Sequence, residues 1–240
     1  MASIAPTLLA ADFARLGQAL EMIGASGAAR AHIDVADGHF LPEITVGAPV
    51  VASLRQATRL WFEVHLAIER PERFVADFAA AGADAISVPA EAAPHLHDVL
   101  AAIRARGKKA GVTLDPATAV DSVADILGDL DSLSIVSGGD FGGMTSMGDR
   151  GSGDTALLPQ LLVKLQHAAQ LRAARGLEFT LQVEGGVTAE NLTALVEAGA
   201  DILVVGSAIF DSQDPKARLA ELISLAGGRE RSRAWDASDQ

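Results

Sequence analysis

The feature that most constrains the fold is an alternation of short apolar segments with Ala- and Leu-rich segments along the 240-residue chain. The apolar segments have the composition of buried strands, and the segments between them have helical periodicity. The expected strands are residues 3–6, 31–35, 60–66, 85–88, 109–114, 132–137, 179–184 and 202–205. The expected helices are residues 13–23, 47–56, 71–81, 94–105, 120–127, 155–174, 189–198 and 208–224. Eight strand–helix units predict a closed (β/α)8 TIM barrel rather than an open doubly wound sheet.

A short repeat supports this regular array. The sequence Ala-Gly-Ala-Asp occurs at residues 81–84 and again at 198–201, each time between a predicted helix and the next strand. Glycine at such a junction is typical of a helix C-cap. We find no internal domain boundary, so residues 1–226 are expected to form one barrel domain. Residues 227–240 are polar and without apolar periodicity, so we expect a disordered tail.

Composition excludes several classes of protein. The chain has no cysteine, which rules out disulfides and thiolate metal sites, and its net charge of −12 argues against a nucleic-acid partner. No apolar stretch reaches the length of a membrane span, and no basic segment followed by an apolar run resembles a secretion signal. We therefore expect a soluble cytoplasmic protein that binds neither nucleic acid nor membrane. A small anion remains possible, because helix N-termini bind phosphate whatever the net charge.

Polar residues occur where several predicted strands end. His32 and Asp34 lie two apart, so their side chains share one face of a strand, while His65 and Glu184 end two other strands. Active sites of barrels lie at the carboxyl ends of the strands. Two imidazoles and two carboxylates suit Zn²⁺, Fe²⁺, Mn²⁺ or Co²⁺, and a carboxylate can also transfer protons. The alternative is a hydrogen-bonded polar network without a metal.

Glycines follow the last two predicted strands. Gly185-Gly186 come after the seventh strand, and Gly206-Ser207 open the last helix. Barrels often hold a phosphate at this position, on backbone N–H groups that glycine leaves accessible. The alternative is that these are ordinary turn glycines. Residues 137–154 form a long Gly-rich loop of the kind that serves as a lid or binding loop.

A set of motifs, taken in order over about residues 3–225, resembles the ribulose-phosphate 3-epimerase family. The motifs are Ile4-Ala5-Pro6-Thr7, Ala11-Asp12-Phe13, His32-Ile33-Asp34, Asp37-Gly38-His39-Phe40, Glu63-Val64-His65-Leu66, Phe141-Gly142-Gly143, Val183-Glu184-Gly185-Gly186-Val187 and Gly206-Ser207-Ala208-Ile209-Phe210. The resemblance implies a TIM barrel of the ribulose-phosphate-binding type. It also implies a metal-dependent enzyme that interconverts ribulose 5-phosphate and xylulose 5-phosphate, and a homo-oligomer with a small sugar phosphate as its partner.

The resemblance also implies roles for individual residues. Asp34 and Glu184 would be the acid–base pair, and Thr7 and His65 would contact the substrate. The divalent metal would be held by His32, Asp34, His65 and Glu184. The phosphate would be held by Gly142, Gly143, Gly185, Gly186, Gly206 and Ser207. The chemistry agrees, because inverting a carbon next to a carbonyl needs one proton-transfer group on each face, and a metal stabilises the enediolate as a Lewis acid.

The chain departs from the family pattern at the site. Glu184 stands where the family has Asp, Ala36 and Ala67 where it has Met, and Pro89 where it has His. Loss of two bulky side chains predicts a wider pocket. A second hypothesis is therefore 3-epimerisation of another ketose phosphate, such as a hexulose 6-phosphate. A metal-dependent lyase or decarboxylase, or a non-catalytic sugar-phosphate-binding barrel, are further alternatives. The lyase would need a cationic group at strand carboxyl ends, whereas Lys108 and Lys109 lie at the opposite end.

Overall fold

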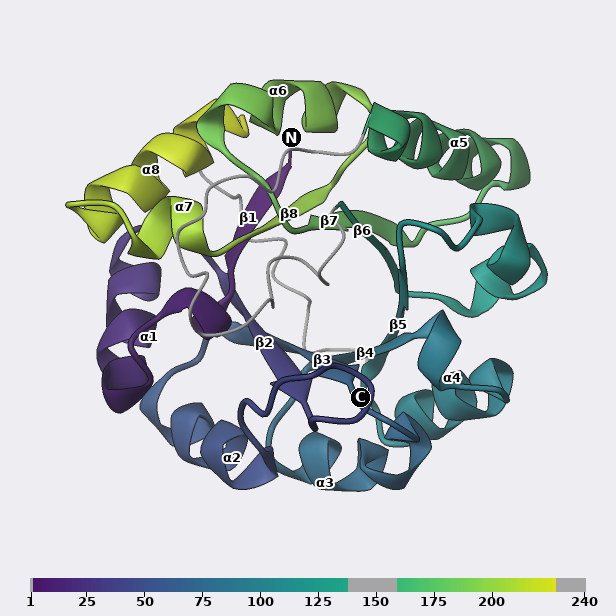
Figure 1. Cartoon of the computed structure of the whole chain (residues 1–240), viewed down its shortest axis with the longest axis horizontal. Helices are drawn as coiled ribbons and strands as arrows, with labels where there is room; N and C mark the ends of the chain where they lie inside the picture. The colour runs from purple at the N-terminus through teal and green to yellow at the C-terminus, as the bar shows by residue number, and fades with distance from the viewer. Residues whose placement is uncertain (1, 138–158, 228–240) are drawn as a thin grey trace.

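The structure is a computed structural model that describes residues 2–137 and 159–227. Eight parallel strands form a ring with the helices outside it (Figure 1), which confirms the predicted TIM barrel. The strands are β1 (Ser3–Pro6), β2 (Arg30–Ala36), β3 (Trp61–Ala67), β4 (Ala85–Pro89), β5 (Lys109–Leu114), β6 (Ser132–Val136), β7 (Thr180–Glu184) and β8 (Ile202–Val205). Their order in the sheet is β1-β8-β7-β6-β5-β4-β3-β2.

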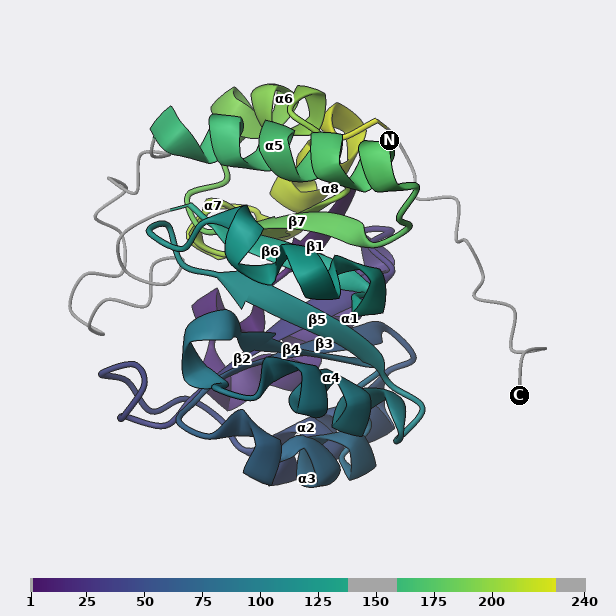
Figure 2. The ribbon, with the colours of Figure 1, turned by 90° about the vertical axis from the view of Figure 1, so that its right-hand side faces the viewer.

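Side-chain alternation along the strands separates an apolar outer layer from an interior that is largely polar, apart from small apolar clusters such as Ala5, Ile202 and Val204. On β3, Phe62, Val64 and Leu66 are fully buried and belong to the main hydrophobic core. Because strand side chains alternate, Glu63 and His65 face the inside of the barrel instead. The helices cover the outside of the strands (Figure 2), so the apolar layer lies between sheet and helices. The interior is left available for chemistry.

Most predicted helices are present, and they occupy the gaps between strands. The α-helices are α1 (Leu16–Ala25), α2 (Ala48–Ala57), α3 (Val75–Ala80), α4 (Leu96–Arg104), α5 (Pro159–Arg175), α6 (Ala189–Glu197), α7 (Ser207–Phe210) and α8 (Pro215–Leu225). The 3-10 segments are η1 (Leu8–Ala10), η2 (Phe13–Arg15), η3 (Pro71–Arg73), η4 (Ala90–Ala92) and η5 (Val120–Asp129). Within the described ranges, no helix has both the length and the apolarity to cross a membrane.

Four helix predictions were wrong in detail, one of them at 71–81, where the 3-10 segment η3 precedes a shorter α3. The segment expected as a helix at 120–127 is the 3-10 segment η5, whose apolar residues at spacings of three and four suit either helix type. The expected helix at 208–224 is two helices, because Asp214 caps α8 and Pro215 can only stand in its first turn. The expected first helix begins as η2, capped by Asp12, before α1.

The barrel closes through a short seam between β1 and β2. The only residue pair joining them as a bridge in the described chain is Thr7 with His32, whereas β2 and β3 are paired over seven positions, from Arg30 with Trp61 to Ala36 with Ala67. Strand β1 ends at Pro6, and β2 continues to Ala36. The carboxyl-terminal part of β2 therefore runs beyond its neighbour.

Three aspartates tie the amino ends of neighbouring strands together. Each lies just before a strand, and its Oδ2 accepts a hydrogen bond of 2.8–2.9 Å from a backbone N–H of the preceding strand. Each also pairs with a basic side chain. We call these the aspartate clamps, and they consist of Asp84 with Arg55 and Phe62, Asp131 with Lys109 and Ala110, and Asp201 with Arg172 and Leu181. Two of the three aspartates end the Ala-Gly-Ala-Asp repeats, which explains why that motif recurs.

Candidate active site

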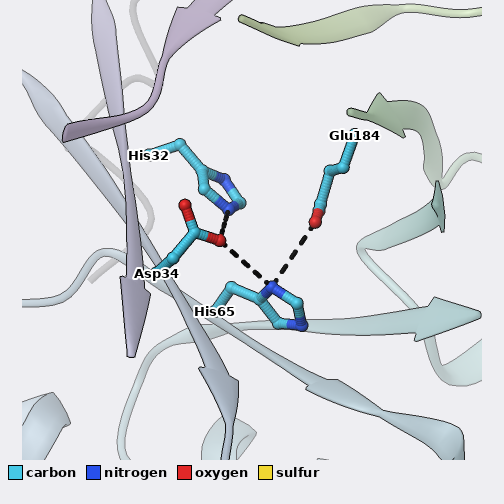
Figure 3. Close-up of side chains that lie close together, drawn as sticks. All are labelled: His32, Asp34, His65 and Glu184. Atoms are coloured by element: carbon cyan, nitrogen blue, oxygen red, sulfur yellow. Dashed lines mark hydrogen bonds and ion pairs between the residues drawn. The ribbon is translucent and has the colours of Figure 1, made fainter. Parts of the chain in front are cut away.

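Four polar side chains converge inside the barrel near the carboxyl ends of its strands. His32 and Asp34 project inward from β2, His65 from β3 and Glu184 from β7 (Figure 3). Strand register explains part of this, since Asp34 lies directly opposite His65 across the β2–β3 ladder. Glu184 arrives from the other side of the ring. The structure thus brings together all four residues that the sequence singled out as a cluster.

The contacts within the cluster are close. His32 Nε2 lies 3.1 Å from Asp34 Oδ1. His65 Nδ1 lies 3.4 Å from Asp34 Oδ1 and 3.4 Å from Glu184 Oε2. Asp34 and Glu184 thus approach His65 from two sides (Figure 3). Exposure is 9% for Asp34, 5% for Glu184 and 2% or less for the histidines. Burial strengthens their mutual interactions, because little water screens them.

A hydroxyl group orients each carboxylate. Thr7 Oγ1 donates to Asp34 Oδ2 at 2.5 Å, and Ser134 Oγ donates to Glu184 Oε1 at 2.5 Å. In both residues the other carboxylate oxygen faces His65. Thr7 was predicted at this site, but Ser134 was missed. The inward positions of β6 carry two serines, Ser132 and Ser134, and the sequence holds no signal that tells which one meets Glu184.

The electrostatics of the cluster follow from its two negative charges. Burial disfavours a charged imidazole, but Asp34 and Glu184 outweigh burial and raise the pKa of His32 from 6.5 to about 10. The pKa of His65 is raised too, against burial, by Glu184 and Asp34. In turn the histidines, His32 first, outweigh burial and hold the pKa of the Asp34 carboxyl well below its usual range. In the metal-free protein these histidines therefore bind protons more tightly than free histidine.

The donor set fits a divalent metal ion. One ligand atom from each of His32, Asp34, His65 and Glu184 lies within 4.8 Å of every other. Imidazole nitrogen and carboxylate oxygen together suit Zn²⁺, Fe²⁺, Mn²⁺ and Co²⁺. The second carboxylate oxygens are hydrogen-bonded to hydroxyls, as outer-shell partners of ligands commonly are. The cluster can therefore hold a divalent metal.

A second polar pair lies within the barrel beside this cluster. Gln182 Nε2 donates to both carboxylate oxygens of Glu63 at 2.9 Å, and both residues are buried. Burial raises the pKa of Glu63. Glu63 and Gln182 each lie two residues before a member of the cluster, His65 and Glu184, on the same strand faces. The sequence interpretation did not assign this pair a role.

At the mouth of the barrel, the structure differs from the wider pocket that the sequence predicts. Ala36 and Ala67, predicted to widen the pocket, are 4% and 0% exposed. They form a small apolar cluster with the buried Leu41, against which Leu9 and Phe40 pack. The space expected to be open is therefore covered by side chains from neighbouring loops. Pro89 ends β4 as a buried residue.

The predicted phosphate-binding glycines occupy tight turns next to the cluster. Gly185 and Gly186 have φ of +84° and +62°, a backbone conformation that favours glycine. Ser137 Oγ donates to the Gly185 carbonyl. A side chain at Gly206 would meet Thr7 and Ala10 at 3.0–3.1 Å, so only glycine fits without a shift. Ser207 begins α7. Gly142 and Gly143 lie outside the described residues, and the phosphate role of the set stays a prediction.

Sequence comparison decides between the families that use this fold. The sequence model of the Ribulose-phosphate 3 epimerase family matches residues 3–210. A ribulose-phosphate 3-epimerase of Bacillus subtilis is 39% identical over 223 residues, which cover 92% of this chain and 98% of the relative. A ribulose-phosphate 3-epimerase of Synechocystis is 40% identical over 211 residues, which cover 87% of this chain and 87% of the relative.

The chain belongs to the ribulose-phosphate 3-epimerase family. The family match covers the strands that carry His32, Asp34, His65 and Glu184. A chloroplastic ribulose-5-phosphate-3-epimerase of Arabidopsis thaliana is also 37% identical over 213 residues, 88% of this chain and 72% of the relative. The resemblance stated from motifs is confirmed.

Solved structures outside the ribulose-phosphate 3-epimerase family share its fold. A thiamine phosphate pyrophosphorylase of Pyrococcus furiosus has a TM-score of 0.63 at 16% identity, with 94% of this chain and 95% of that chain covered. A mutant tryptophan synthase alpha-subunit of the same organism has a TM-score of 0.65 at 15% identity, with 93% and 97% covered. At these identities the likeness concerns the fold alone, so function has to be argued from the site.

Adding Co²⁺ or Mn²⁺ to metal-free protein is expected to raise its melting temperature. At 100 times Kd, binding to the folded state alone adds about 2.7 kcal/mol, or roughly 5–10 °C for a chain of this size. Because the pKa of His32 is raised to about 10 and that of His65 is raised too, the cation must displace protons, so affinity should fall between pH 8 and pH 6 by up to about tenfold per pH unit for each proton displaced. Thermal melts and titration calorimetry measure both effects.

Matched histidine variants provide the control. His32→Gln should remove the shift in melting temperature. His97→Ala should keep it, since His97 is exposed and lies beside Asp98 and Asp129 rather than in the cluster. An equal shift in both variants would place the bound cation outside the cluster.

Proposed function

We propose that the chain is a metal-dependent epimerase that interconverts ribulose 5-phosphate and xylulose 5-phosphate by inverting C3. The observation that carries the proposal is the placement of Asp34 and Glu184, which approach His65 from two sides of the barrel and are each oriented by a hydroxyl. Inversion requires one group to remove a proton from one face of C3 and another to return a proton to the opposite face. Two buried carboxylates on different strands meet that requirement.

In this proposal the chain's own residues carry the protons. One carboxylate accepts the C3 proton, and the other donates a proton to the opposite face of the same carbon. Thr7 and Ser134 hold one oxygen of each carboxylate, so that the remaining oxygen points into the centre of the site. Fixed geometry of this kind matters, since small misplacements of reacting groups cost much of the rate.

His32, Asp34, His65 and Glu184 would hold the metal. When bound, a divalent cation supplies a Lewis acid that stabilises the negative charge developing on the substrate oxygens. The glycine turns at Gly185-Gly186 and Gly206-Ser207 would hold the phosphate through backbone N–H groups, and Thr7 and His65 would contact the sugar. Gly142 and Gly143 complete the predicted phosphate set.

The structure gives less support than the sequence to a larger ketose phosphate as substrate and to a lyase. The hypothesis of a larger ketose phosphate depended on space left by Ala36 and Ala67, and that space is covered by Leu41, Leu9 and Phe40. The lyase hypothesis needs a cationic group at a strand carboxyl end, but Lys109 is bound to Asp131 at the amino end of β5. Lys164 does reach the carbonyl of Asp115, just beyond the carboxyl end of β5, but it comes from α5 rather than from a strand. We retain a homo-oligomer in the cytoplasm as the expected assembly and location.

The test is solvent-deuterium exchange followed by NMR. Purified protein loaded with Mn²⁺, Co²⁺ or Zn²⁺ is mixed in D₂O with ribulose 5-phosphate, xylulose 5-phosphate or a ketohexose 6-phosphate. We expect deuterium at C3 together with inversion for the two pentulose phosphates, and slower reaction for the hexulose phosphate. Metal bound without exchange in any sugar would refute the epimerase proposal. Faster reaction of the hexulose phosphate would refute the choice of substrate.

A further inference from the structure

The strand that carries Asp34 lacks a neighbouring strand along part of one edge. β1 ends at Pro6 and pairs with β2 only through the Thr7–His32 bridge, while β2 continues to Ala36. In a strand, the N–H and C=O of one residue point to the same edge, and so do those of the residue two positions on. The main-chain groups of Asp34 and Ala36 that face the seam therefore lie beyond the end of β1, and they need other partners.

One residue from the following loop provides these partners. Thr45 Oγ1 donates to the Asp34 carbonyl at 2.9 Å and accepts from the Ala36 N–H at 2.9 Å. The Thr45 N–H donates to the Ala36 carbonyl at 3.2 Å. Three successive main-chain groups of β2 are thus bonded to Thr45, which takes the place of the missing strand.

The local fold of the loop directs Thr45 toward the strand. The Gly38 N–H donates to the Glu43 carbonyl at 2.7 Å, and Asp37 forms an antiparallel bridge with Ile44. The loop therefore folds back along the end of β2 as a short hairpin. Ile44 is 83% exposed, whereas Thr45 is half-buried against β2. The pattern of an outward Ile44 and an inward Thr45 follows from strand alternation.

We propose that Thr45 is a positioning residue for Asp34, an inference that rests on the proposed function and extends it. Thr7 and the two histidines fix the carboxylate of Asp34, but its backbone is held on the seam side by Thr45. Without the Thr45 hydroxyl, the Asp34 carbonyl and the Ala36 N–H lose their shared partner, and the end of β2 gains freedom to shift. A shift of this strand end moves the carboxylate relative to C3 and to Glu184.

The experiment compares isosteric and conservative variants of Thr45. Thr45→Val keeps the shape and loses the hydroxyl, and is expected to lower kcat at least about tenfold with KM changed less than about twofold. Thr45→Ser keeps the hydroxyl and should restore kcat to within about threefold of wild type. The affinity for the metal, measured separately as Kd, should be lower in Thr45→Val, because Asp34 is also a proposed ligand.

A threonine at the other end of the barrel provides the matched control. Thr180 Oγ1 donates to the Asp131 carbonyl at the amino end of β7, so Thr180→Val deletes the same type of bond far from the site. It should leave kcat unchanged. Equal losses of kcat in both valine variants, or an active Thr45→Val, would overturn the role of Thr45. If Thr45→Val does not fold, Thr45→Ala against Thr45→Ser gives the same comparison. An inactive wild type would instead refute the proposed function.

Discussion

Replacing Glu184 by Gln is expected to reduce interconversion of ribulose 5-phosphate and xylulose 5-phosphate by about 1,000-fold, the size typical of losing a general acid or base. The amide keeps the length of the side chain and can still accept from Ser134, which donates to Oε1 in the wild type. It cannot carry a proton at the operating pH. At saturating metal, which is needed because Glu184 is also a proposed ligand, the change therefore removes proton transfer on one face of C3 and leaves the packing nearly intact.

The Glu184→Gln variant should still exchange deuterium into one of the two epimers. Asp34 remains able to remove the C3 proton that faces it and to return a deuteron to the same face. Only the epimer whose proton points toward Asp34 would then exchange, and it would do so without inversion. NMR of each sugar phosphate separately in D₂O measures this. Equal exchange into both epimers would show that Glu184 is not the second proton carrier.

Glu63→Gln is the control for this prediction. Glu63 is a buried carboxylate in the same barrel, but both of its oxygens accept hydrogen bonds from Gln182, whereas one oxygen of Asp34 and one of Glu184 face His65. The same amide substitution should therefore change the epimerisation rate by less than about threefold. A large loss of epimerisation rate in Glu63→Gln would indicate that the rate depends on any negative charge in the interior of the barrel, rather than on the position of Glu184.

Replacing Asp34 by Asn is expected to abolish interconversion to a similar extent, with the opposite pattern of exchange. The epimer that exchanges in Glu184→Gln should become inert, and the other should exchange through Glu184. Asp34 is also a proposed ligand, and its Oδ1 lies 3.1 Å from His32 Nε2. The Kd for the metal should therefore rise by about 10–100-fold. Exchange must therefore be measured at saturating metal. Activity near wild type would show that Asp34 is not a proton carrier.

Asp34→Asn should remain folded. Asp34 bonds to Thr7, His32 and His65 through its side chain, but the core that holds the barrel lies between strands and helices. Removing the negative charge also lowers the pKa of His32, so the buried histidine can become neutral instead of leaving an unpaired charge. A native near-ultraviolet circular dichroism spectrum checks this.

The strands could be read from the sequence because they are buried on the helix side and carry apolar residues there. The ends of β1, β5 and β8 are those predicted, and the other strands differ by one or two residues. The type and the bounds of the helices were harder to predict from the sequence. The spacing of Val120, Val123 and Leu127 suits both an α-helix and the 3-10 segment that forms. The break before α8 was readable in principle, since Asp214-Pro215 is a typical helix start.

The site could be predicted only where side chains follow strand alternation. His32, Asp34, His65 and Glu184 are placed by that rule and by the closure of the barrel. Thr45 is placed by the way a loop folds back onto β2, which no periodicity encodes. The covered state of Ala36 and Ala67 depends on side chains from other loops as well. Such contacts between distant segments arise only when the chain folds.

The aspartate clamps separate the frame of this barrel from its site. They fasten neighbouring strands at the amino end of the barrel, where Asp84, Asp131 and Asp201 repeat one chemistry. The cluster of His32, Asp34, His65 and Glu184 lies toward the carboxyl ends of the strands, and the fastening at the amino end does not depend on it. Residues at the carboxyl end, such as Ala36, Ala67 and Glu184, can therefore be exchanged in this chain while the barrel keeps its frame.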